Sequence, residues 1–207
     1  SNRSAECQAR TLPLPIFEKE NAFEYLHRYD QVAIVDSDIW VRPNAPNIFH
    51  DFDSGVDFGA VVEREMPITK QYMNKIINYS NMQYSSLKDV DFSPDPRGYE
   101  FMNMGLMVMN KSILKYLRGE SPQEFLGRPE FKRFIDGVGP WKWSTDQTLL
   151  NYWIRKEKMN IQRLHWKWNG LYTANTNIRE CHFVHFFLKD KLPNNGENVD
   201  ELMRIVQ

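Results

Sequence analysis

Short apolar runs recur along the chain and predict the strands of a sheet. Residues 32–35 and 58–62 are unbroken apolar runs, a pattern typical of strands buried on both faces. The first of them predicts a central strand of the sheet. Residues 106–109 form a third run, and residues 160–166 and 182–187 favour two more strands.

Helices are predicted for several of the segments between these strands. Residues 17–29, 68–79, 111–118 and 145–157 favour helices, and the last ten residues predict a surface helix. In the first helix the predicted buried stripe consists of Ala22, Tyr25, Leu26 and Tyr29. Because buried strands alternate with helices, we expect an α/β fold whose sheet is covered on both faces.

Two of the helices carry start signals, and one long segment carries the signals of a loop. Ser121 and Glu124 have the spacing of a capping box, with Pro122 at the first helical position. Ser144 is the predicted cap of the helix over 145–157. Residues 84–99 are polar and contain two prolines and a glycine, so they predict a long loop of the kind that often carries function.

Composition and charge narrow the class of protein. A chain of 207 residues suits a single domain, which we expect to span 1–207. The net charge of −1 provides no basic field for nucleic acid, so we expect no nucleic-acid partner. No apolar run approaches the ~18 residues that cross a bilayer, so we expect no membrane span. Cys7 and Cys181 lack the number and spacing of a disulfide framework or a metal cluster.

The strongest chemical signal is a pair of acids directly after the first apolar run. Asp36 and Asp38 follow residues 32–35 with one residue between them. Carboxylates are costly inside an apolar sheet, but at the end of a strand they reach the crevice in which open α/β sheets bind ligands. Two such acids can bind a hard divalent cation, which would neutralise a diphosphate. An Asp-x-Asp pair also occurs in ordinary turns, so the strand in front of it gives the signal its weight.

Two polar segments farther along the chain could serve the same crevice. Asn103 offers both a donor and an acceptor to sugar hydroxyls, and Gly105 predicts a close approach to the backbone. Asp146 and Gln147 begin the helix over 145–157, where free N–H groups suit an anion. A simple turn before a core strand explains the first segment equally well, and helix capping explains the second.

A late histidine could complete a metal shell. His185 lies within the predicted strand 182–187, although a lone histidine is more often packed in a core or exposed. Near the carboxylate pair it would supply a third ligand. Lys191 follows shortly afterwards and could hold a phosphate as a point charge.

Taken in order, these segments resemble glycosyltransferase family 8 and its relatives with the A-type fold. The motifs that carry the resemblance are Val35-Asp36-Ser37-Asp38, Asn103-Met104-Gly105, Asp146-Gln147, Trp168-Asn169, and His185-Phe186 with Lys191. The resemblance as a whole extends from about residue 14 to 193. This chain departs from the family's closing segment by having Leu188 in place of glycine and Leu192-Pro193 in place of Pro-Trp. The resemblance implies a Rossmann-like mixed sheet with flanking helices. It also implies that this domain lacks the family's usual first strands, as an N-terminally truncated domain would.

The resemblance further implies a reaction and a role for each matched residue. The family moves a hexose, usually from a UDP-sugar, to a saccharide or glycoconjugate acceptor with retention of configuration. The implied metal ligands for Mn²⁺ or Mg²⁺ are Asp36, Asp38 and His185; the implied donor-binding residues are Lys19, Asp36, Asn103 and Lys191; the implied catalytic residues are Asp146 and Gln147.

Two alternative functions remain open at this stage. A phosphatase of the haloacid-dehalogenase type also has an Asp-x-Asp pair after an apolar strand, with the first acid as nucleophile. That motif requires Thr or Val where this chain has Trp40, and we find no late acidic pair for magnesium. The other alternative is an inactive domain that binds a sugar or a protein partner. Metal-dependent hydrolysis of a nucleotide-sugar would distinguish the transferase from both.

Overall fold

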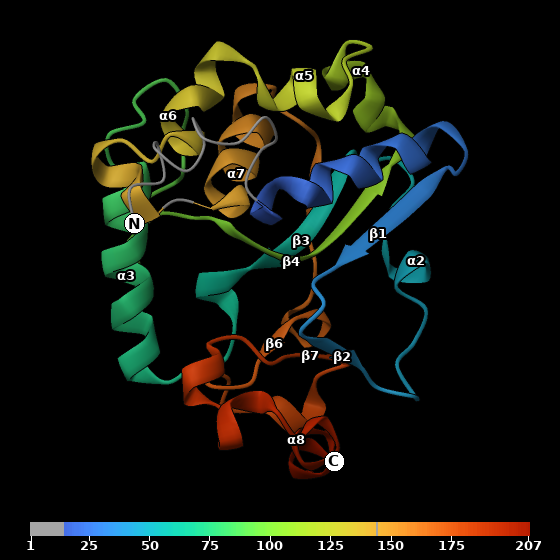
Figure 1. Ribbon diagram of the computed structural model, residues 1–207, viewed down its shortest axis with the longest axis vertical. Helices are drawn as coiled ribbons and strands as arrows, with labels where there is room; N and C mark the ends of the chain where they lie inside the picture. Colours follow the sequence, from blue (N-terminus) through green and yellow to red (C-terminus); the bar gives the residue numbers. More distant parts are fainter. Residues whose placement is uncertain (1–14, 144) are drawn as a thin grey trace.

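The computed structural model describes residues 15–143 and 145–207 and shows a mixed α/β fold (Figure 1). A four-stranded sheet has the order β1-β4-β3-β5, and a three-stranded sheet has the order β2-β7-β6. The strands are β1 (Gln31–Val35), β2 (Ile39–Val41), β3 (Phe58–Val62), β4 (Met102–Asn110), β5 (Ile161–Arg163), β6 (Gly170–Leu171) and β7 (Phe183–His185). Each sheet contains both parallel and antiparallel pairs, which confirms the predicted mixed sheet with flanking helices.

Helices surround these sheets. The α-helices are α2 (Ile48–Asp51), α3 (Lys70–Tyr84), α4 (Leu114–Leu117), α5 (Pro122–Leu126), α6 (Lys132–Ile135), α7 (Asp146–Lys156) and α8 (Val199–Val206). The 3-10 helices are η1 (Pro15–His27), η2 (Glu63–Glu65), η3 (Lys111–Ile113), η4 (Pro129–Phe131), η5 (Gly139–Trp143), η6 (Trp166–Trp168), η7 (Ile178–Glu180), η8 (Lys189–Lys191) and η9 (Pro193–Gly196). In the described ranges no helix has both the length and the apolar character needed to cross a membrane.

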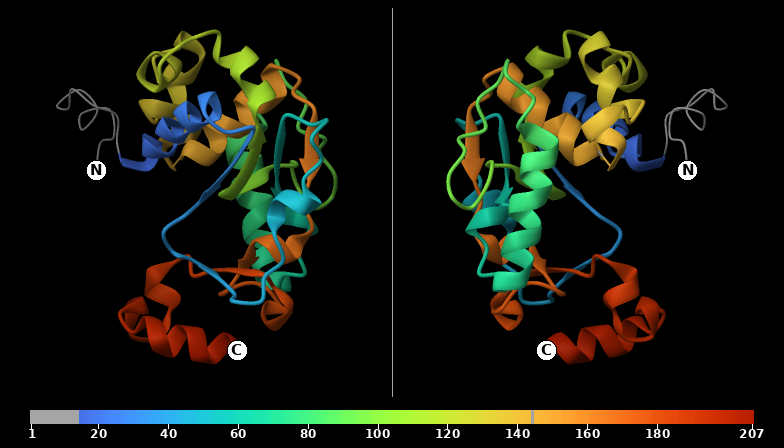
Figure 2. Two further views of the ribbon diagram at one scale, coloured as in Figure 1. Left: turned by 90° about the vertical axis from the view of Figure 1, so that its right-hand side faces the viewer. Right: turned by 90° about the vertical axis from the view of Figure 1, so that its left-hand side faces the viewer.

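The larger sheet is buried on both faces by different partners. Along β4, Met107 and Met109 belong to one core and Leu106 and Val108 to another, because side chains alternate across a strand. Helices η1, α5, α6 and α7 cover the first face, in the upper half of Figure 1. The second face packs against α2 and the smaller sheet. The smaller sheet lies with α8 at the end of the molecule opposite α5 and α6 (Figures 1 and 2).

The position of β1 differs from the prediction of a central strand. Among the described residues β1 lies at the edge of its sheet and pairs antiparallel with β4 alone. Its residues are partly exposed, and Val35 is 37% exposed. An apolar run predicts a strand but does not say how many strands lie beside it. The burial predicted for β1 was therefore too high.

The first helix also differs in its pitch. The segment Pro15–His27 is a 3-10 helix, in which every third residue lies on the same side. Its buried residues are therefore Phe17, Glu20, Phe23 and Leu26, of which only Leu26 belongs to the predicted stripe. Of that stripe, Tyr25 and Tyr29 are exposed. Burying each of the three apolar side chains stabilises the fold by about 1.5–3 kcal/mol, and a three-residue spacing aligns all of them with the core.

Capping signals proved reliable where the structure describes them. Ser121 and Glu124 form the predicted capping box at the start of α5. The cap of α7 is Thr145, whose Oγ1 accepts a hydrogen bond from the backbone N–H of Gln147. The predicted cap, Ser144, lies outside the described residues.

Candidate active site

The two acids of the Asp-x-Asp pair stand where the chain passes from the larger sheet to the smaller one. Asp36 follows β1, and its backbone N–H donates to the carbonyl of Gly105 at 2.8 Å. Asp38 precedes β2, and its carbonyl accepts from the backbone N–H of Phe186 at 2.9 Å. Each acid is therefore fixed by the backbone of a different sheet. The turn between them holds both carboxylates on one side of the chain.

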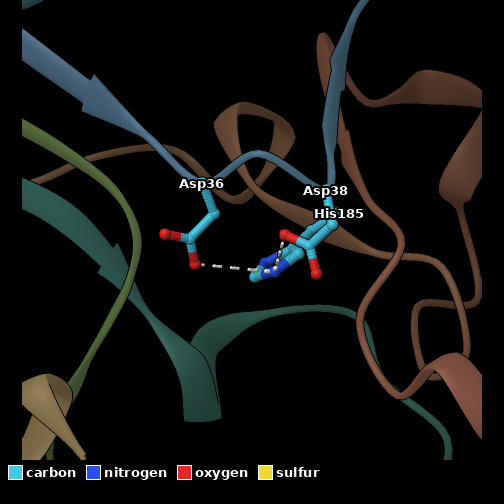
Figure 3. A group of neighbouring side chains, drawn as sticks. All are labelled: Asp36, Asp38 and His185. Atoms are coloured by element: carbon cyan, nitrogen blue, oxygen red, sulfur yellow. Dashed lines mark ion pairs between the residues drawn. The ribbon is translucent and has the colours of Figure 1, made fainter. Parts of the chain in front are cut away.

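His185 meets this pair from the end of β7, so that three candidate metal ligands converge (Figure 3). The His185 Nε2 atom lies 3.2 Å from Asp38 Oδ1 and 3.9 Å from Asp36 Oδ2. One ligand atom from each residue lies within 4.8 Å of the others. Two carboxylates and an imidazole form a donor set that suits Mn²⁺ and related divalent cations. These residues therefore fit the metal that the resemblance implies.

Two neighbours fix the orientation of the His185 ring. Its Nδ1 atom lies 3.2 Å from Asn169 Oδ1, so Nδ1–H can donate there and leave Nε2 free to bind a metal. Asn169 Nδ2 donates in turn to Asn103 Oδ1 at 2.8 Å. A Cβ atom at Gly105 would lie 2.5 Å from the ring's Cε1, so the ring packs where only glycine leaves room. The predicted close approach at Gly105 is thus to His185.

Lys19 links the Asp-x-Asp turn to the start of α7. Its Nζ atom lies 2.6 Å from Asp36 Oδ1 and 2.8 Å from Asp146 Oδ2, and it donates to the carbonyl of Met104 at 3.1 Å. Asp146 is 7% exposed, so this ion pair is largely shielded from water. The start of α7 therefore lines the same cavity as Asp36, whereas Asp38, which the sequence placed in the same crevice, lines a neighbouring cavity.

The two acids of the pair differ in their electrostatic surroundings. Burial raises the pKa of Asp36, although the ammonium group of Lys19 works against that rise. A hydrogen bond with His185 lowers the pKa of Asp38, which is also the more exposed of the two. Asp38 is therefore the carboxylate that stays ionised most readily, and it is accessible to a cation from solvent.

A cavity of about 540 Å³ opens beside this group, and the charged and amide side chains in its lining include most of the predicted site. Its lining includes Lys19, Asp36, Glu63, Tyr72, Asn103, Gly105, Asp146, Gln147, His185, Phe187 and Leu188. Gln147 Oε1 accepts from the backbone N–H of Met104, which positions the side chain against β4. We call this space the polar cavity.

Glu63 is a site residue that the sequence reasoning missed. It directly follows β3, lines the polar cavity and is 5% exposed. Its Oε1 atom accepts from Asn103 Nδ2 at 3.1 Å and from the Tyr72 hydroxyl at 3.3 Å. Burial raises the pKa of Glu63 to about 7. An acid directly after a buried run was the signal used for Asp36, and the same signal at residues 58–62 would have found Glu63.

Two predicted site residues do not line this cavity: Asp38, which contacts His185 beside it, and Lys191. The Lys191 Nζ atom pairs with the neighbouring Asp190 at 3.1 Å, and its side chain is 58% exposed. Leu188 adopts φ +60°, a left-handed conformation that favours glycine, the residue expected here from the family. The chain turns at this point, and Lys189 faces a different cavity. A role for Lys191 in donor binding stays a prediction.

Comparisons with known proteins give structural rather than sequence similarity. No protein-family model matches the sequence, and no curated protein is significantly similar to it. The chain is similar to mouse xyloside xylosyltransferase 1 in its apo form, with 17% identity, a TM-score of 0.46, and coverage of 86% of this chain and 65% of that one. It is also similar to the apo bifunctional glycosyltransferase WbbM, with 14% identity, a TM-score of 0.48, and coverage of 84% and 31%. The chain thus spans less than two thirds of either protein.

Proposed function

We propose that this chain is the catalytic domain of a metal-dependent glycosyltransferase that moves a hexose from a UDP-sugar to a saccharide or glycoconjugate acceptor. The observation that carries the proposal is the convergence of Asp36, Asp38 and His185 at the rim of the polar cavity. A phosphate-binding cation next to a cavity rich in hydroxyl-binding groups suits a sugar diphosphate. Bound there, a divalent cation would neutralise charge on the leaving diphosphate.

The residues of the polar cavity have distinct roles in this proposal. Asn103 and Asp146 hydrogen-bond the donor sugar, because each presents a fixed polar side chain to the cavity. Lys19 holds Asp36 and Asp146 in place and contributes positive charge near the diphosphate. Gln147 is neutral and is bonded to β4, so it orients the sugar rather than attacking it.

We propose front-face transfer with retention. The bond from the sugar's anomeric carbon to the diphosphate oxygen breaks, and the bond to the acceptor oxygen forms on the same face. The acceptor's proton passes to the departing diphosphate. Glu63 is also a carboxylate in this cavity, so the detection of a sugar covalently attached to Glu63, Asp146 or Gln147 by mass spectrometry would overturn this mechanism.

The test of the function is metal-dependent binding and hydrolysis of UDP-sugars. Calorimetry should show UDP binding that requires Mn²⁺, and NMR should show a released sugar with retained configuration. Asp38→Asn should abolish the metal-dependent binding while leaving thermal unfolding unchanged, because Asp38 is partly exposed. Asp91→Asn, an exposed acid in the loop after α3, is the matched control.

Other outcomes of the same assay would replace this function. Hydrolysis of simple phosphate esters in place of UDP-sugars would favour a phosphatase with Asp36 as nucleophile. Binding of sugar without any metal-dependent turnover would favour an inactive binding domain. Equal binding of UDP and Mn²⁺ by the parent and Asp38→Asn would show that the metal site is misassigned.

A further inference from the structure

A second cavity, lined mainly by apolar side chains, adjoins the candidate metal ligands. It has a volume of about 500 Å³ and lies between β2 and the C-terminal segments η8, η9 and α8. Its apolar walls include Trp40, Phe186, Val199 and Leu202, and Asp38 is part of its lining. We call this space the apolar cavity. The function proposed above makes no use of it.

The two cavities lie on either side of the candidate metal ligands. Asp36 and His185 line the polar cavity, whereas Asp38 lines the apolar one. The next residue after His185, Phe186, faces the apolar cavity, because side chains alternate along an extended chain. A cation held by the three ligands would therefore stand at the junction of the two spaces.

We propose that the apolar cavity binds the base of the nucleotide-sugar donor, with the diphosphate at the metal ligands and the sugar in the polar cavity. This inference rests on the proposed function, since it concerns the same donor. A nucleotide-sugar has a flat ring at one end, hydroxyls at the other and a diphosphate between them. The arrangement of one apolar cavity, one cation site and one polar cavity has the same order.

The walls of the apolar cavity suit a flat heteroaromatic ring. The indole of Trp40 provides a stacking surface, and its partner Arg42 holds it in place with a guanidinium carbon 5.2 Å from the ring centroid. Arg42 is itself anchored to backbone carbonyls, including that of Val206 at 2.6 Å. Asn195 offers an amide to the edge of a base, and Lys189 adds positive charge beside the phosphates.

The acceptor is a less suitable occupant of this cavity. Its reacting hydroxyl must reach the anomeric carbon of the sugar, which the polar cavity holds. A group in the apolar cavity would be separated from that carbon by the diphosphate. The acceptor therefore approaches through the open side of the polar cavity.

A matched pair of substitutions on α8 tests this inference. Val199 lines the apolar cavity and is 53% exposed, whereas Ile205 is 41% exposed on the same helix and is not part of the lining. Val199→Trp fills the cavity without disturbing the core, and Ile205→Trp is the control. UDP and pyrophosphate are titrated with Mn²⁺ by calorimetry, and thermal unfolding checks that each variant folds.

We expect Val199→Trp to weaken UDP binding by at least about tenfold and to leave pyrophosphate binding within about twofold of the parent. Ile205→Trp should bind both ligands like the parent. Trp40→Ala should weaken UDP binding by roughly 5- to 150-fold, the range for losing one stacked base, again without affecting pyrophosphate.

The other outcomes separate this inference from the function on which it rests. Equal losses for UDP and pyrophosphate in Val199→Trp, or no loss for either, would overturn the base site while leaving the transferase intact. A Val199→Trp variant that keeps its UDP affinity but no longer binds a free saccharide would assign the cavity to the acceptor. A parent chain that binds neither UDP nor pyrophosphate with Mn²⁺ would overturn the proposed function and the base site together.

Discussion

Replacing Glu63 by glutamine should remove a specific part of the chain's pH-dependent stability. Burial raises the pKa of Glu63 from its ordinary 4.5 to about 7. Between these two values the folded chain binds more protons at this site than the unfolded chain does. Rising pH therefore lowers the free energy of unfolding across this window. Glutamine keeps an oxygen that can accept from Asn103 and Tyr72, but it does not titrate.

The size of the effect follows from the pKa difference. Raising the pH from 5 to 8 should cost the parent about 2.5 kcal/mol through Glu63 alone, and Glu63→Gln should be spared this loss. Urea unfolding at the two pH values in chelating buffer measures the difference, since a bound cation would add its own pH dependence. Burial also raises the pKa of Glu20, to about 8. Glu20→Gln is therefore a parallel case, which should remove a separate part of the stability lost between pH 5 and pH 8.

The reasoning would be wrong if the parent and Glu63→Gln lost the same stability between pH 5 and pH 8. Glu63 would then be ionised in the folded chain across this range. A Glu20→Gln variant that removed the whole pH dependence would also contradict the reasoning, because it would leave nothing for Glu63 to explain.

Three further substitutions test the geometry of the site. Asn169→Ala removes the partner of His185 Nδ1 and should weaken Mn²⁺ binding by about 10- to 100-fold, measured by calorimetry, whereas unchanged affinity would show that the ring needs no such partner. Gly105→Ala places a Cβ against the His185 ring and should also weaken Mn²⁺ binding; a crystal structure with an unmoved ring would contradict this. Gln147→Ala should lower turnover by roughly 10- to 1000-fold, the scale of losing one oriented polar contact, in steady-state assays with a UDP-sugar. Unchanged turnover would remove Gln147 from the mechanism.

Much of the fold could be predicted because its strands and longer helices carry strong local signals. The apolar runs at 32–35, 58–62 and 106–109 all became strands of one sheet. Helix α7 begins within a residue of its predicted start. The predictions that failed required information that local sequence patterns do not contain. A three-residue helical pitch in η1 and the edge position of β1 depend on which elements pack beside them.

The candidate site likewise contains some residues that the sequence could identify and others that it could not. Residues in sequence motifs, such as Asp36, Asp38 and His185, were found because each follows or lies in an apolar strand. Glu63 also follows an apolar strand, but it matches none of the motifs that carry the family resemblance. It reaches the site only because β3 and β4 run antiparallel, which brings the end of one beside the start of the other. The apolar cavity could not be foreseen either, since its walls come from β2 and α8, more than a hundred residues apart in sequence.

The position of the Asp-x-Asp turn between the two sheets also has a mechanical consequence. Asp36 extends from the larger sheet, whereas His185 ends β7 of the smaller one, whose own core includes Val184 and Leu202. A cation bound to both would add a link between the two sheets beside the core that they share. A ligand that binds only the folded state raises its free energy of unfolding by RT ln(1 + [L]/Kd). Metal binding would therefore stabilise the arrangement in which the two sheets hold the three ligands together. Release of the metal together with the nucleotide would then remove this link between the sheets.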